Sequence, residues 1–177
     1  MLTEYIGVAQ LKDLVDQHAR LVEEVPVSEF TRLRQATLPH PAVAEPQFAV
    51  VLEFSREPEQ QEPGLTVKID GEIAVECQRC LEPLVLPVSV EQSCMLLNSG
   101  RKPDDEQQLF DVVQVGERGL AIKDLIEDEV LSAIPLAPRH EDCVAPDLPD
   151  GKPDATDDAD GVHKPFEGLA DLLKKDS

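Results

Sequence analysis

Positive charge is scarce in this sequence. The 177 residues include 16 Lys and Arg against 36 Asp and Glu, which gives a formal net charge of −20 at pH 7. Proteins that hold bare nucleic acid neutralise its phosphates with Lys and Arg and release counterions. This surplus of carboxylates therefore argues against a protein that grips a polyanion unaided.

Long apolar runs, a basic leader and abundant cysteine are also missing. No segment approaches the roughly 20 apolar residues that span a bilayer, and the start, Met1 to Glu4, lacks the positive charge of a secretory signal. We therefore expect a soluble, cytoplasmic protein without membrane contact. The 4 cysteines are too few for a disulfide scaffold. In a reducing compartment, the close pair Cys77 and Cys80 suggests metal binding or redox chemistry instead.

The apolar residues that are present alternate in a way that predicts a sheet with helices. Period-two patterns predict strands over 48–54, 65–77, 84–96 and 109–115, with a short one from Leu21 to Val27. Helical spacing predicts helices over 3–18 and 120–134, and Ser28 is suited to cap a helix carrying Phe30 and Leu33. The expected fold class is α+β, an antiparallel sheet with packed helices, over residues 1–140. Within the long strand, the apolar phase continues through Gly71, which favours a bulge or kink over a hairpin turn.

The C-terminal part has a different composition. Residues 141–163 are rich in Asp and Pro and poor in bulky side chains, which predicts an acidic, disordered linker. Residues 164–177 regain helical spacing, with Phe166, Leu169 and Leu172 on one side. This short amphipathic helix either folds back onto the parent domain or inserts into a partner's groove. The pattern leaves both open.

Two pairs of metal-ligating residues have the same spacing. Cys77 with Cys80, and His140 with Cys143, together give a Cys₃His set that suits a structural zinc. The pairs are separated by 59 residues, so the sequence leaves open whether they meet. Cys94 is an alternative ligand, and a tight turn with thiols packed as small apolar groups is another interpretation. A redox pair is disfavoured because strand patterns flank both cysteines, whereas a low-pKa thiolate normally lies at a helix N-terminus.

Charged residues offer two further candidate surfaces. Glu127, Asp128 and Glu129 point in different directions at helical spacing, which favours a solvated or partner-facing patch over a divalent-cation site. A local basic patch would contact RNA only if folding gathered cations from separate segments, and net repulsion favours scattered solubilising charges. Those cations are Arg32, Arg34, Arg79, Arg101 and Lys102. No phosphate-binding glycine loop or zinc-protease motif is present in the sequence.

Four runs of residues, in this order along the chain, resemble the bacterial YceD family. They are residues 75–83, 126–138, 140–143 and 164–166 with Leu169 and Leu172. The N-terminal third is similar only in its pattern of elements. The family's members are named large ribosomal RNA subunit accumulation proteins, so the resemblance implies a cytoplasmic role in accumulation or maturation of the 23S ribosomal RNA, without a known catalytic activity. The family's motif positions fall on Cys77, Arg79, Cys80, Glu127, Asp128, Glu129, Pro135 and Pro138.

Charge and resemblance together predict a non-catalytic ribosome-assembly factor. A chain of charge −20 is suited to hold a basic partner, such as a large-subunit ribosomal protein or a pre-ribosomal particle. The resemblance supports such a partner, because family genes commonly neighbour that of a small basic ribosomal protein. Direct binding of 23S ribosomal RNA and a metal or thiol redox protein are the alternatives. The candidate binding residues are Arg79, Glu127, Asp128, Glu129, Phe166 and Leu169.

Overall fold

The computed structural model describes residues 2–56, 62–105 and 107–146. Residues 1–145 form one compact unit. Most of the predicted acidic linker and the whole predicted C-terminal helix, with Phe166 and Leu169, lie outside the described residues.

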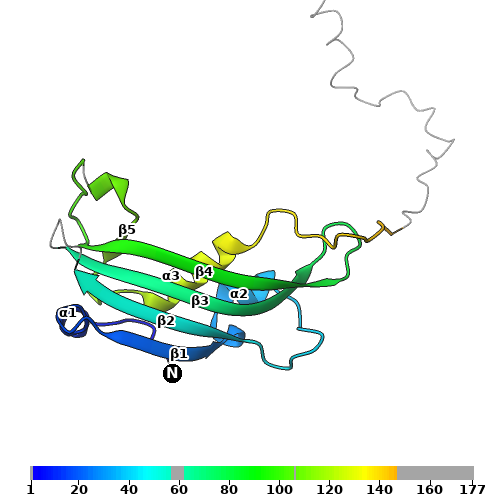
Figure 1. Ribbon diagram of the computed structural model, residues 1–177, viewed down its shortest axis with the longest axis horizontal. Helices are drawn as coiled ribbons and strands as arrows, with labels where there is room; N and C mark the ends of the chain where they lie inside the picture. Colours follow the sequence, from blue (N-terminus) through cyan, green and yellow to red (C-terminus); the bar gives the residue numbers. More distant parts are fainter. Residues whose placement is uncertain (1, 57–61, 106, 147–177) are drawn as a thin grey trace, which may run out of the picture. The chain divides into compact units, whose positions relative to one another are not determined.

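Five strands form one curved sheet in the order β1-β2-β3-β4-β5 (Figure 1). They are β1 Arg20–Pro26, β2 Gln47–Arg56, β3 Pro63–Glu76, β4 Pro83–Asn98 and β5 Val112–Val115. The first four strands pair antiparallel, whereas β5 pairs parallel to β4. The α+β class is confirmed, but the expectation of a purely antiparallel sheet is wrong at β5. The loop between β4 and β5 returns the chain to Met95 before β5 begins, so both strands run in the same direction.

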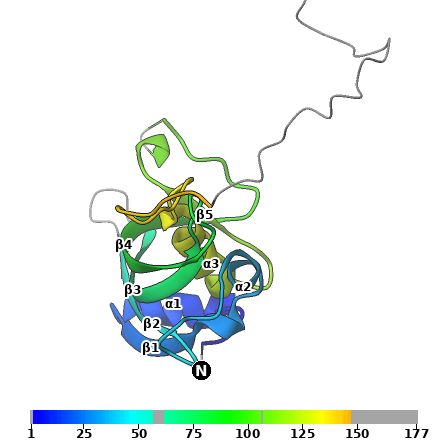
Figure 2. The same cartoon turned by 90° about the vertical axis from the view of Figure 1, so that its right-hand side faces the viewer.

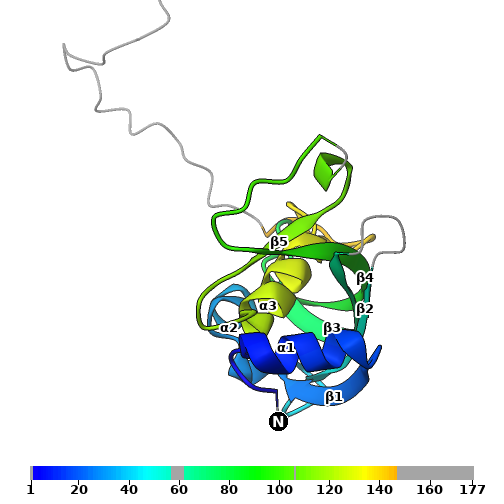
Figure 3. The same ribbon diagram turned by 90° about the vertical axis from the view of Figure 1, so that its left-hand side faces the viewer.

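Helices cover one face of the sheet (Figures 2 and 3). They are α1 Val8–Asp16, α2 Thr31–Ala36 and α3 Ile122–Ala133, with 3₁₀ turns η1 Val27–Glu29 and η2 Gln107–Leu109. The prediction that Ser28 caps α2 is wrong, because Ser28 lies in η1 and its hydroxyl donates to Glu45 Oε1 at 3.2 Å. Among the described residues, no helix is long and apolar enough to cross a membrane.

The core lies between the helices and the inner face of the sheet. Alternate residues of β2 and β3 point into it, and α2 and α3 supply the opposite side. The predicted alternation is confirmed, and each fully buried apolar side chain contributes about 1.5–3 kcal/mol relative to exposure. The core residues from these four elements include Leu33, Phe48, Val50, Leu52, Phe54, Leu65, Val67, Ile69, Ile73, Ile122, Ile126 and Val130.

Gly71 lies in the middle of β3, on the core side. It pairs with Phe48 of β2 and with Val88 of β4 in a continuous register, so the predicted bulge is absent from this strand. A Cβ atom at this position would lie 2.6 Å from Phe48 Cδ1 and 2.8 Å from the Gln47 carbonyl oxygen. Glycine is therefore required by the close approach of the buried Phe48 ring to the backbone of β3.

Gly71→Ala is expected to lower the free energy of unfolding by about 1–3 kcal/mol, because Phe48 and the backbone of β2 must move apart. Urea denaturation followed by circular dichroism measures this change. Gly7→Ala is the matched control, since a Cβ atom at Gly7 meets nothing within 4 Å. Equal unfolding free energies for the Gly71 variant and the wild type would show that the strand accommodates a side chain here.

Candidate metal centre

The connection between β3 and β4 is a tight turn that presents two cysteines. Cys77 N–H donates to the Glu82 carbonyl at 3.0 Å, and Leu81 N–H donates to the Cys77 carbonyl at 2.9 Å. Leu81 has a φ of 65°, in the left-handed region. Pro83 then opens β4 at a position where no N–H is needed. Cys77 is buried and Cys80 is partly exposed on the same turn.

The segment after α3 comes back to this turn. Gln78 N–H donates to the Pro138 carbonyl at 2.8 Å, which fixes the chain just before His140. Arg79 Nη1 donates to the Cys143 carbonyl at 2.9 Å and to the Glu141 carbonyl at 3.5 Å. These bonds hold the two predicted pairs of ligands face to face. The end of the described chain accordingly lies beside the β3–β4 connection (Figure 1).

The four candidate ligand atoms form a compact cluster. The Sγ atoms of Cys77, Cys80 and Cys143 and a ring nitrogen of His140 all lie within 4.8 Å of one another. Cys77 Sγ is 3.6 Å from Cys143 Sγ, and Cys80 Sγ is 3.4 Å from His140 Nδ1. Tetrahedral zinc, with bonds of about 2.3 Å to sulfur and about 2.0 Å to nitrogen, places its ligands roughly 3.5–3.8 Å apart. The two contacts above are close to this range, and the cluster is one that can hold a metal ion.

Backbone N–H groups stabilise the thiolate form at the centre of the cluster. Burial raises the pKa of Cys77, but hydrogen bonds from backbone N–H groups, first that of Cys80 and then that of Arg79, outweigh it and lower the pKa to about 5. A metal ion binds the thiolate, so a low pKa favours binding at neutral pH. Strands rather than a helix flank Cys77 and Cys80, so the helix N-terminus typical of a redox thiolate is absent from this turn.

Cys94 is separate from this centre. It lies on the core side of β4, where its thiol donates to the Leu65 carbonyl at 3.5 Å. Burial, with smaller contributions from Glu129 and Asp111, raises its pKa to about 12. The alternative in which Cys94 replaces a ligand is therefore wrong, and its interpretation as a buried structural thiol is confirmed.

The three acids of the cluster on α3, Glu127, Asp128 and Glu129, have different surroundings, and Glu127 is the buried one. The Glu127 side chain is 7% exposed, and its Oε1 accepts Leu33 N–H at 2.8 Å. Its Oε2 accepts Arg32 Nε at 2.9 Å. Burial raises the pKa of Glu127, but these hydrogen bonds outweigh that effect and hold it below its ordinary value. The expectation that Glu127 belongs to a solvated or partner-facing patch is wrong, because its carboxylate caps the N-terminus of α2 from inside the fold.

The other two acids of the cluster remain accessible. Asp128 is exposed and its Oδ1 accepts Arg32 Nη1 at 2.6 Å. Glu129 is partly buried, and burial, followed by repulsion from Asp111 and Asp128, raises its pKa. One signal in the sequence hints at the role of Glu127: Phe30, the residue before α2, has no side chain that can cap a helix.

Three of the five basic residues considered for RNA contact, Arg32, Arg79 and Arg101, are engaged within the fold. Arg32 binds Glu127 and Asp128, and Arg79 binds the carbonyls near the metal centre. Arg101 Nη2 pairs with Glu62 Oε1 at 2.6 Å. A patch built from these three side chains would have to break contacts that the fold uses.

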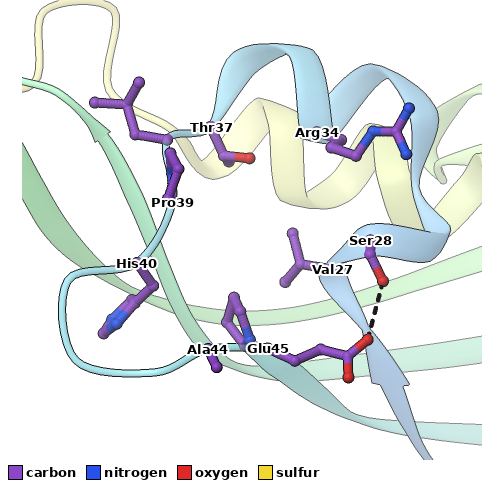
Figure 4. Close-up of a pocket in the computed structure, with 10 residues that line it drawn as sticks. Val27, Ser28, Arg34, Thr37, Pro39, His40, Ala44 and Glu45 are labelled. Carbon is purple, nitrogen blue, oxygen red and sulfur yellow. Dashed lines mark hydrogen bonds between the residues drawn. The ribbon is translucent and has the colours of Figure 1, made fainter.

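A separate cavity of about 270 Å³ lies between α2 and the loop before β2 (Figure 4). Its lining is mainly apolar, and the guanidinium of Arg34 points away from the other lining side chains (Figure 4). His40 Nδ1 accepts the N–H groups of Ala42 and Val43, at 3.2 and 3.0 Å. Among the lining side chains, Ser28 Oγ donates to Glu45 Oε1 at 3.2 Å, but this contact is exposed to solvent. The Cys₃His cluster gathers four ligand atoms within 4.8 Å of one another and is the stronger candidate site.

Comparisons with known proteins cover this region of the chain. A family model described as large ribosomal RNA subunit accumulation protein YceD matches residues 65–173, which include all four candidate ligands. The protein of that name from Haemophilus influenzae is 28% identical over 74 residues, which are 41% of this chain and 42% of the relative. The match thus spans less than half of that relative's length. No solved structure matches the chain.

Proposed function

Because this chain belongs to the YceD family of large ribosomal RNA subunit accumulation proteins, we propose that it supports accumulation of the 23S ribosomal RNA in the cytoplasm as a non-catalytic adaptor. Its partner in this proposal is a basic protein of the large subunit, free or within a pre-ribosomal particle. The observation that supports this role is the distribution of charge: six of the twelve Lys and Arg side chains in the described residues form ion pairs within the fold, and carboxylates outnumber cations in the chain.

Several cations of the fold have carboxylate partners. Arg20 pairs with Glu53 at 3.1 Å, and Lys68 with Glu91 at 3.0 Å. The same holds for Arg32, Arg56, Arg101 and Lys123. Since the chain carries a net charge of −20, its field is negative and accelerates encounters with a cationic protein. Ribosomal RNA, with denser negative charge, then displaces the adaptor during assembly.

In this proposal the Cys₃His cluster holds a structural zinc. All four positions around the ion are filled by protein, which is typical of a structural rather than a catalytic site. The ion links the β3–β4 turn to the segment after α3, where Arg79 and Gln78 already hold the backbone. The expected folded domain, residues 1–140, is therefore longer in this proposal and extends past Cys143. The acidic linker then runs to residue 163, and the helix 164–177 follows it.

A low-salt pull-down with the full-length, tagged protein tests the adaptor role. Mass spectrometry is expected to recover basic large-subunit proteins or pre-ribosomal particles, with recovery falling as salt rises. Filter binding to protein-free 23S transcript is the control, and little retention is expected. Tight, salt-sensitive capture of the transcript, with no ribosomal protein recovered from the lysate, would contradict the adaptor role and favour direct RNA binding through a basic site.

A further inference from the structure

We propose that the open edge of β4, together with the C-terminal end of α3, binds an extended basic peptide segment that adds a strand to the sheet. This surface is separate from the metal centre. The choice of a basic protein as its source rests on the proposed function, whereas strand addition rests on the backbone of β4.

Much of β4 has an unpaired edge. Only Met95 to Asn98 are covered by β5, although β4 begins at Pro83. Met95 N–H donates to the Asp111 carbonyl at 2.8 Å, so the backbone groups of Met95 face away from β3. By alternation, those of Glu91, Ser89 and Val85 face the same way. In the described ranges, no hydrogen bond reaches these groups.

The position of proline in β4 agrees with this direction. Pro87, like Ser89 and Met95, is one of the alternate residues of β4 whose backbone groups face the open edge. Proline lacks an N–H, so the donor that it removes is one on the open edge and not one in the ladder with β3. The antiparallel ladder with β3 therefore continues past it without loss. An open strand edge of this kind offers hydrogen bonds that a second chain can complete.

An apolar cavity lies directly beneath this edge. It measures about 210 Å³ and is lined by side chains of β4 and of the end of α3, including Leu86, Val88, Ile134 and Pro135. The C-terminal end of α3 lies beside β4 (Figure 1). Because side chains of a strand alternate between faces, every second residue of an added strand would point toward this cavity. The strand edge, the end of α3 and the apolar cavity together form a groove, which suits an extended peptide with alternating apolar residues.

The charges beside the groove select the occupant. Asp111 lies at the end of the open edge, where its carbonyl accepts Met95 N–H at 2.8 Å and its side chain accepts Gln92 Nε2. Burial, followed by repulsion from Asp111 and Asp128, raises the pKa of Glu129, so Glu129 lies near them. Among the described residues, neither Glu129 nor Asp111 has an ion-pair partner within 4.0 Å. A basic segment supplies the missing cations. The chain's own residues 147–163 are rich in Asp, so the same charges disfavour that segment as the occupant.

Fluorescence anisotropy with the full-length, metal-loaded protein tests the groove directly. The probe is a labelled decapeptide of alternating lysine and valine. Methylation of its alternate backbone nitrogens removes the donors that a strand needs but keeps its charge, and is expected to weaken binding by about tenfold or more. An analogue with glutamate in place of lysine is expected not to bind. Equal affinity for the methylated peptide would overturn strand addition, and equal affinity for the acidic one would overturn the basic occupant.

Ser89→Pro and Ser89→Ala form a matched pair of variants. Both remove the hydroxyl that donates to Asp70 at 2.8 Å, but only proline removes the outward N–H. We expect Ser89→Pro to bind the lysine-valine peptide about tenfold more weakly than Ser89→Ala. Circular dichroism and zinc content, unchanged in both, show that the fold is intact. Equal peptide binding by the two intact variants would overturn the assignment to β4, and preferential binding of a peptide of residues 164–177 would assign the groove to this chain's own C-terminus.

The same variants separate this inference from the proposed function. If Ser89→Pro loses peptide binding and also recovers fewer ribosomal proteins from lysate, the partner uses the groove. If it recovers them as the wild type does, the groove is not the adaptor surface and the inference fails while the adaptor role stands. If the wild type binds the peptide but recovers no ribosomal protein, the proposed function fails and the strand-addition site stands.

Discussion

Cys143→Ser protein is expected to purify without bound zinc and to melt at least roughly 10 °C below the wild type. The substitution removes one thiolate from a cluster whose four ligand atoms lie within 4.8 Å of one another. The ion then loses its tetrahedral set, and the segment 138–143 keeps the bonds from Gln78 and Arg79 and the contact of Cys80 with His140. Because Cys77 and Cys80 are then no longer joined through a bound ion, the β3–β4 turn also loses stability.

Elemental analysis and thermal denaturation of the same preparations measure both effects. The wild type is expected to contain one zinc per chain. When a strong chelator removes the zinc, its melting temperature is expected to fall by as much as in Cys143→Ser. Cys94→Ala is the matched control, because Cys94 is buried away from the cluster and its substitution should leave the zinc content at one. Wild-type protein with no zinc and with readily titrated Cys77 and Cys80 would contradict the structural zinc and favour a thiol pair.

Local periodicity was sufficient to predict the main elements of this fold. In β3, side chains from Leu65 to Ile73 alternate between the core and the more exposed face, and the strand lies where the pattern places it. The spacing of Ile122, Ile126 and Val130 likewise identifies the buried side of α3. These features were predictable because each depends on neighbouring residues and on one periodicity.

Features that depend on distant segments were not predictable in the same way. Period two identifies a strand but not its direction, so the parallel pairing of β5 with β4 was missed. The alternation through Gly71 predicted the strand, yet the reason for glycine lies in the Phe48 ring on a neighbouring strand. Such contacts depend on which surfaces the tertiary fold brings together.

The candidate site has one feature that depends on local spacing and one that depends on contacts between distant segments. The spacing of Cys77 with Cys80, and of His140 with Cys143, identifies two half-sites from the sequence. Their meeting depends on hydrogen bonds from Gln78 and Arg79 to the segment after α3, which no spacing rule contains. The family resemblance placed Arg79 among the motif positions, and the structure gives it a physical role in holding Cys143 beside the turn.

Glu127→Gln is expected to lower the free energy of unfolding by roughly 2–3 kcal/mol at pH 7. The buried carboxylate accepts Leu33 N–H at 2.8 Å and the Arg32 guanidinium at 2.9 Å. Glutamine keeps the shape and one acceptor oxygen, but it loses the charge and turns an amide N–H₂ toward one of these donors. Since Phe30 offers no side-chain cap, α2 has no local substitute for the lost acceptor.

The pH dependence of this loss identifies its electrostatic origin. In the folded protein the pKa of Glu127 lies below its ordinary value of 4.5, so the carboxylate stabilises the fold fully above about pH 5 and loses its contribution as the pH falls below 4.5. Urea denaturation of the wild type and of Glu127→Gln should therefore give a constant difference at neutral pH that shrinks in acid. Asp128→Asn is the control: its exposed pair with the same Arg32 should contribute little. If the two substitutions had equal effects, or if the Glu127 difference persisted in acid, α2 would not depend on a charged cap supplied by α3.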